Sequence, residues 1–287
     1  MNARGKMRPK PTIKNLKRIV RKSHEPEPYA RYVVRPISIY FTWVFVRTPL
    51  SANQVTVIQE VIGIAGAVLL GLGRIEWAIV GILLLQLGYI LDCSDGEVAR
   101  WKEQKSIDGV YLDLVGHMIV IPVYMFTIGF GAWMQTGQME FLISGFLSAL
   151  FIGRLERFTL LDVVDSLVTN AGTEQYSFEH IRGKLEEPVE QVPMGSAGSI
   201  GRRSWLQILF RYPDSMNVIT VAIILDLFFQ GITMGTRFYP FTGILSILFG
   251  TLLTVGRLWQ IRRVFRNSLT ESRFLQILKL ARKIYQD

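Results

Sequence analysis

Cysteine and charged residues are scarce in this sequence, and each shortage excludes a class of protein. Among 287 residues there is one cysteine, Cys93, which rules out an intrachain disulfide framework and a cluster of thiolate metal ligands. Only 19% of the residues are charged while 49% are hydrophobic, a balance that is unusual for a soluble domain. No internal repeat is visible, which argues against a transporter built from repeated halves. The composition therefore indicates a membrane protein.

The sequence contains several long apolar stretches. Six of them approach the ~20 residues that a helix needs to cross a bilayer. They are residues 53–71, 76–96, 108–134, 140–161, 214–232 and 238–260. We therefore predict an all-α, polytopic membrane protein in which six transmembrane helices surround a polar cavity that faces the cytoplasm, with interfacial helices in addition.

The positive charge is unevenly placed along the chain, whose net charge is +9. Lysines and arginines are dense before Leu50, whereas the loops near 71–76, 135–138 and 230–238 contain one basic residue or none. Positively charged flanks of membrane spans remain in the cytoplasm, so we predict that both termini and the segment 91–107 are cytoplasmic. Because the basic residues lie beside the spans, we expect membrane lipids as partners and no nucleic acid.

Three regions follow from these patterns. Residues 1–50 read as a basic tail and an interfacial amphipathic helix, the helix covering 29–49. Residues 51–267 form the six-helix transmembrane domain, which includes a charged cytoplasmic loop at 162–212. Residues 268–287 alternate apolar and basic side chains, and we predict a C-terminal amphipathic helix lying on the membrane surface.

A polar cluster interrupts the apolar pattern in the stretch LDCSDGEVARWKEQKSIDGVYLDLVGH, residues 91–117. At 100° per residue, two helices would each present a polar, glycine-containing face. The first face carries Asp92, Gly96 and Ala99, flanked by Asp95 and Arg100, and the second carries Gly109, Asp113, Gly116 and His117. Carboxylates so close together would repel one another unless a cation lay between them. We therefore predict a site for Mg²⁺ or Mn²⁺, with two ions able to neutralise a pyrophosphate.

These positions resemble the signature of the CDP-alcohol phosphotransferase (CDP-alcohol phosphatidyltransferase) family, D-x-x-D-G-x-x-A-R, eight residues, G-x-x-x-D-x-x-x-D. The layout of the spans and the stretch RTPLSANQVT at 47–56 are also similar to the family, so the resemblance covers most of 47–265. It implies an enzyme that transfers a phospho-alcohol or phosphatidyl group from a CDP-alcohol donor to an acceptor hydroxyl and releases CMP. It also implies a homodimer, with catalysis in the domain 51–267.

The resemblance assigns roles to the matching residues. Metal ligands are expected at Asp92, Asp95 and Asp113. The CDP site is expected to contain Gly96, Ala99, Arg100 and Gly109, with Asn53 and Thr56 bordering the cytidine.

The sequence departs from the motif at its last position, where His117 replaces the aspartate that the family is thought to use as general base. We predict His117 as catalytic base or metal ligand beside Asp113, since neutral imidazole can accept a proton near neutral pH. Imidazole also removes a negative charge and favours softer ions than Mg²⁺. Two readings stay open: a packing residue, or an altered or inactive family member that binds CDP-linked lipid or a protein partner.

The acceptor site has weaker support. Arg154, Arg157 and Arg211 are predicted near the cytoplasmic ends of spans, where they could bind an acceptor that carries phosphate. Interfacial arginines that only set the orientation of the protein are an equal alternative. The acceptor itself, a lipid or a polar alcohol, is left open.

Overall fold

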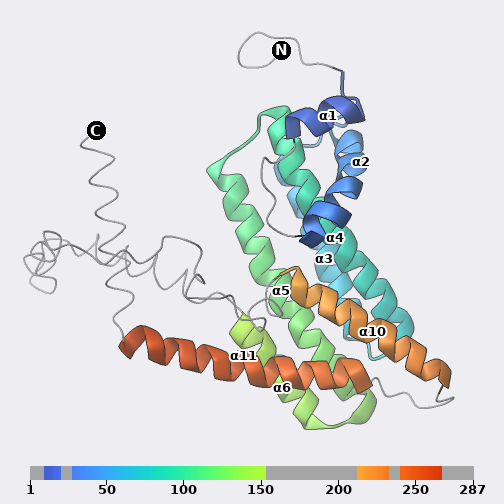
Figure 1. Ribbon diagram of the computed structural model, residues 1–287, viewed down its shortest axis with the longest axis vertical. Coiled ribbons are helices and arrows are strands. Elements are labelled where there is room, and N and C mark those ends of the chain that lie inside the picture. The colour runs from blue at the N-terminus through green and yellow to red at the C-terminus, as the bar shows by residue number, and fades with distance from the viewer. Residues whose placement is uncertain (1–9, 21–27, 153–211, 233–239, 267–287) are drawn as a thin grey trace, which may run out of the picture. The chain divides into compact units, whose positions relative to one another are not determined.

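The computed structural model describes residues 10–20, 28–152, 212–232 and 240–266, and every element in these ranges is a helix (Figure 1). The predicted all-α class is therefore confirmed. The chain divides into two units, Met1–Ile152 with Leu209–Thr251 and Gly153–Ile208 with Leu252–Asp287. Of the second unit the structure describes only residues 252–266, which are the end of the last helix. The predicted loop 162–212, apart from Tyr212, and the predicted helix 268–287 lie outside the described residues.

Short helices form the N-terminal region. Helix α1 (Ile13–Val20) is followed by a π-helical segment, η1 (Ala30–Val34), which continues directly into α2 (Arg35–Phe45). The helix predicted over 29–49 is thus found over residues 30–45, with a π-helical first part. Leu16, Ile39 and Trp101 form a small buried cluster, which joins α1 and α2 to the helix that carries the first half of the motif. These N-terminal helices are therefore packed on the protein, and their position at a membrane interface stays a prediction.

Four of the described helices are long and apolar enough to cross a membrane. They are α3 (Ala52–Leu70), α4 (Ile75–Lys102), α5 (Ile107–Thr136) and α11 (Pro240–Arg266). Helix α6 (Met139–Ile152) is apolar but shorter, and the rest of the span predicted there lies outside the described residues. Helix α10 (Asp214–Ile232) covers the predicted fifth span. These four candidate spans fit the predicted multi-pass membrane protein, whereas the number six remains a prediction.

Helix α3 packs against both α4 and α5 and so positions the two halves of the motif. Where α3 crosses α4, a Cβ on Gly66 would lie 2.7 Å from the carbonyl oxygen of Gly81, and one on Gly81 would lie 2.6 Å from that of Gly66. Real side chains do not tolerate such distances, so the two backbones can approach this closely only because both residues are glycine.

The turn between α4 and α5 accounts for the eight-residue spacer of the motif. Helix α4 ends at Glu103, which adopts the left-handed conformation with φ of 58°. Ser106 then caps α5 by accepting a hydrogen bond from the backbone N–H of Gly109 at 3.0 Å. Gln104 in the turn accepts a hydrogen bond from the backbone N–H of Ala52 at 3.0 Å. The start of α3 is thereby held beside the turn.

Candidate active site

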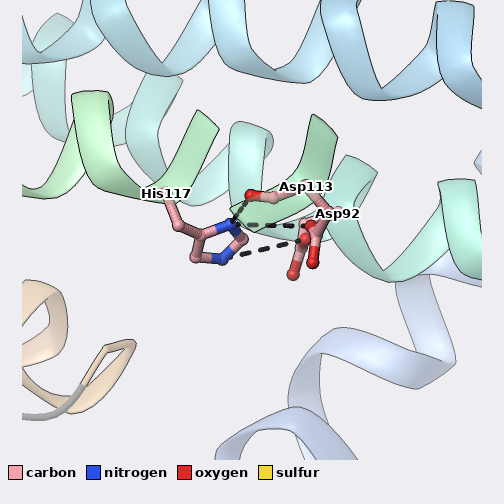
Figure 2. A group of neighbouring side chains, drawn as sticks. All are labelled: Asp92, Asp113 and His117. Carbon is pink, nitrogen blue, oxygen red and sulfur yellow. Dashed lines mark hydrogen bonds and ion pairs between the residues drawn. The ribbon is translucent and has the colours of Figure 1, made fainter. Parts of the chain in front are cut away.

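Asp92, Asp113 and His117 meet between α4 and α5. One potential ligand atom from each residue lies within 4.8 Å of the others. The Nε2 atom of His117 is 3.9 Å from Asp92 Oδ1, and its Nδ1 atom is 3.5 Å from Asp113 Oδ1 (Figure 2). The three side chains remain between 20% and 41% exposed, so a ligand can reach them.

The orientation of the His117 ring fixes which nitrogen is available for chemistry. Nδ1 lies 2.9 Å from the main-chain carbonyl oxygen of Asp113, one helical turn earlier. A carbonyl oxygen can only accept a hydrogen bond, so Nδ1 carries the hydrogen in the neutral ring. The lone pair is then on Nε2, on the side of Asp92. His117 is therefore prepared to accept a proton or bind a metal through Nε2.

Asp95 stands apart from this trio, although the sequence grouped all four residues as metal ligands. Its Oδ2 atom accepts a hydrogen bond of 2.6 Å from Thr56 Oγ1. Thr56 is buried, with 4% of its surface exposed. In the structure Thr56 thus orients Asp95. The roles predicted for both residues stay predictions.

Glu60 is a functional candidate that the sequence reasoning missed. Its carboxylate lies against the backbone of Gly116, beside His117, so tightly that a Cβ on residue 116 would overlap it. The side-chain amide of Gln59 donates to Glu60 Oε1 at 2.9 Å and to Asp92 Oδ1 at 3.4 Å. A usable signal was present, because Glu60 is the one charged residue in the apolar stretch 53–71, where charge is costly unless it has a function.

Tyr212 also contacts His117, and the sequence did not predict it as a site residue. The two rings meet edge to face at 90°, with centroids 5.1 Å apart. Burial raises the pKa of the Tyr212 hydroxyl well above its ordinary value, and the Asp92 carboxylate raises it further. The hydroxyl therefore stays protonated. Gln59, Glu60, His117 and Tyr212 all contribute to the lining of one small pocket.

The residues predicted for the CDP site lie around the start of α5 and the end of α4. A Cβ on Gly109 would lie 3.1 Å from Asn53 Oδ1, which places Asn53 of α3 directly against this glycine. The guanidinium of Arg100 folds back over Gly96, since a Cβ on Gly96 would lie 3.4 Å from its Nη1 atom. These contacts bring together residues from both halves of the motif and from the stretch 47–56.

A buried ion pair anchors α2 beside this region. Glu97, whose side chain is 4% exposed, accepts hydrogen bonds from Arg35 at 2.9 Å, Ser38 at 3.1 Å and Thr42 at 2.7 Å. Glu97, at the first variable position of D-G-x-x-A-R, thus holds α2 against α4.

Comparison with protein families agrees with this geometry. The model of the CDP-alcohol phosphatidyltransferase family matches residues 50–174, a segment that contains α3, α4, α5 and α6. The segment 50–174 is therefore similar to this family, and the resemblance seen in the motif is confirmed over that segment. The family implies phosphatidyl transfer from a CDP-alcohol. No curated protein matches the chain.

Divalent metals are used by CDP-alcohol phosphatidyltransferases, and the residues present fit such an ion. Asp92 and Asp113 offer carboxylate oxygens and His117 offers an imidazole nitrogen, all within reach of one centre. Oxygen ligands suit Mg²⁺, and a mixed set of oxygen and nitrogen also suits Mn²⁺. Asp95 could join this set through its second oxygen, Oδ1, while Oδ2 accepts the hydrogen bond from Thr56.

The predicted acceptor residues Arg154, Arg157 and Arg211 lie outside the described residues. Their assignment to an acceptor site stays a prediction.

Proposed function

We propose that this CDP-alcohol phosphatidyltransferase domain is catalytically active and transfers a phospho-alcohol or phosphatidyl group from a CDP-alcohol to an acceptor hydroxyl, with release of CMP. The observation that carries the proposal is the His117 ring, held by the Asp113 carbonyl so that Nε2 faces the carboxylate of Asp92. An imidazole in the position of the family's aspartate is thereby oriented as a base.

Each residue has a distinct part in this reaction. Asp92, Asp95 and Asp113 would bind one or two divalent ions, Mg²⁺ or Mn²⁺, which would supply charge neutralisation at the pyrophosphate. His117 has one lone pair, on Nε2, because Nδ1 donates to the Asp113 carbonyl, and it uses this lone pair as the base and not as a metal ligand. His117 Nε2 accepts the proton of the acceptor hydroxyl. The acceptor oxygen then bonds to the phosphorus that carries the donated alcohol, and the bond from that phosphorus to the CMP oxygen breaks.

The nucleotide is positioned by the residues around the glycines. The Arg100 guanidinium, folded over Gly96, offers a fork of N–H donors to a phosphate. Asn53 donates to the nucleoside through its side-chain amide, a role supported by its position beside Gly109. Ala99 and Gly109 leave room for a ligand at the two helices because their side chains are small or absent.

We further propose six transmembrane helices around a cavity on the cytoplasmic side, both termini in the cytoplasm, and a homodimer in the lipid bilayer. The distribution of lysine and arginine supports this orientation. The dimer follows from the family resemblance alone.

A second function, binding of CDP-linked lipid without turnover, is favoured by one observation only: the motif aspartate is His117. An inactive relative would keep the carboxylates for metal and nucleotide and would lack a competent base.

Measuring CMP release by the purified full chain distinguishes catalytic turnover from binding without turnover. Two donor and acceptor pairs are tested: CDP-diacylglycerol with polar alcohols, and small CDP-alcohols with diacylglycerol. Each pair is assayed with Mg²⁺ or Mn²⁺. We expect the wild type to release CMP and the variants Asp113→Asn and His117→Ala to lose this activity. The control Glu140→Gln, which removes an exposed carboxylate at the start of α6, should release CMP at the wild-type rate. Normal CMP release from Asp113→Asn would sink the catalytic assignment. A silent wild type with an active His117→Asp variant would establish the binding function instead.

A further inference from the structure

Glu60 of α3 lies outside the family signature, yet its carboxylate faces the motif residues. We propose that Glu60 supplies the negative charge that the motif loses at His117, as the fourth carboxylate of the metal site. The inference rests on the proposed function, because it assumes that Asp92 and Asp113 hold a divalent ion beside His117.

The first argument is position. The Glu60 carboxyl group occupies the space that a side chain at residue 116 would need, so it lies against α5 immediately before His117. Only glycine at 116 permits this contact. A carboxylate from α3 therefore reaches the turn of α5 on which the family places its last acidic ligand.

The second argument is the connection through Gln59. An amide NH₂ group has two hydrogens, and Gln59 uses them on Glu60 Oε1 at 2.9 Å and on Asp92 Oδ1 at 3.4 Å. The two carboxylates are thus held within one hydrogen-bonded unit. The other amide atom, Gln59 Oε1, is buried and has no hydrogen-bond partner among the described residues. A buried orphan acceptor in this pocket indicates a group that the site has still to receive.

The third argument is charge. Four motif aspartates would contribute four negative charges, and three aspartates with a neutral His117 contribute three. Glu60 restores the fourth from a different helix. A lone carboxylate in an apolar span is otherwise costly, because no cationic side chain pairs with it within ion-pair distance in the described part of the chain. A bound cation removes that cost.

The proposal is tested by removing the carboxylate at residue 60 and introducing one at residue 117. The full chain in detergent is titrated with Mn²⁺ alone, and free Mn²⁺ is followed by electron paramagnetic resonance. The variants are Glu60→Gln, His117→Asp, the double variant of both, and Glu140→Gln as the matched control. The unfolding midpoint of each is measured without and with Mn²⁺.

We expect Glu60→Gln to weaken Mn²⁺ binding about 10-fold to 100-fold, the range found for groups that support metal ligands. The double variant should bind within about 3-fold of wild type, because one carboxylate has replaced the other. Glu140→Gln should match wild type. Wild-type affinity in Glu60→Gln, no recovery in the double variant, or no Mn²⁺ binding by wild type would each overturn the proposal.

A further variant, Gly116→Ala, keeps every carboxylate and displaces only that of Glu60, and it is also made in a Glu60→Ala background. Gly116→Ala should weaken Mn²⁺ binding as Glu60→Gln does, since the new methyl group displaces the carboxylate. In a Glu60→Ala background the methyl group has space, so Gly116→Ala should cause no further loss there. Equal losses in both backgrounds would show that Gly116 matters for another reason and would contradict the placement.

These outcomes are independent of turnover. Weakened Mn²⁺ binding in Glu60→Gln together with a wild type that never releases CMP would retain the metal-site inference and reject the proposed function. Unchanged Mn²⁺ binding in Glu60→Gln together with normal CMP release would do the reverse.

Discussion

His117 donates from Nδ1 to the backbone carbonyl of Asp113, 2.9 Å away and one turn earlier on the same helix. The bond uses the backbone of Asp113 and not its carboxylate, so Asp113 can hold an ion with the carboxylate while its backbone orients the base. The orientation of the His117 ring is therefore set within α5 and needs no third residue. In many hydrolases, by contrast, an acidic side chain orients the catalytic histidine.

The pH dependence of turnover should report this base. Histidine works as a base only when neutral, so we expect kcat to fall as pH drops through the range of a histidine, whose reference pKa is about 6.5. In His117→Asp the acid limb should move to lower pH, because the reference pKa of aspartate is about 3.9. Profiles of kcat against pH for both proteins make the comparison, and identical acid limbs would remove His117 from the role of base.

Thr56 should act through Asp95. Thr56→Val keeps the shape of a buried side chain but removes the hydroxyl that donates to Asp95 at 2.6 Å. We expect kcat or Mn²⁺ affinity to fall about 10-fold to 100-fold, as for other groups that orient a ligand.

The matched control is Thr251→Val on α11, where the hydroxyl bonds only to carbonyls of its own helix and is exposed. A similar loss in the control would mean that the effect comes from removing any threonine hydroxyl from a membrane helix.

Arg35 should stabilise the fold through Glu97. Arg35→Met would leave the Glu97 carboxylate buried without its cation, and breaking a buried pair from one side costs about 3–5 kcal/mol. We expect a lower unfolding midpoint in detergent. Arg35→Met combined with Glu97→Leu should recover most of the loss, since neither charge then remains. Equal midpoints for wild type and Arg35→Met would show that the pair is not important for stability.

A side chain added where α3 crosses α4 should lower the stability of the fold. Gly66→Ala places a Cβ 2.7 Å from the Gly81 carbonyl, so the helices must separate, and overpacking of this kind costs about 1–3 kcal/mol. The control is Gly256→Ala on α11, where a Cβ would meet nothing within 4 Å. Thermal unfolding should show a lower midpoint for Gly66→Ala and an equal or higher one for Gly256→Ala. An unchanged midpoint in Gly66→Ala would contradict the close crossing.

The N-terminal region shows where reading from sequence was incomplete. Aromatic and basic residues over 29–49 predicted an interfacial helix, and helices are found there. The pattern did not reveal that Arg35 on α2 pairs with Glu97 on α4, because ion pairs between helices distant in sequence leave no periodic signal.

The sequence alone determined the helical membrane class and the two polar faces. Apolar length and the 3.6-residue period are local properties, so the spacing of Asp92, Asp113 and His117 already predicted their meeting. Tertiary structure decided which face of α3 meets them. That packing, set by close contacts such as Gly66 with Gly81, directs Thr56 to Asp95 and brings Glu60 against Gly116. The rotation of one helix against another depends on side chains far apart in the chain, so only the folded protein fixes it.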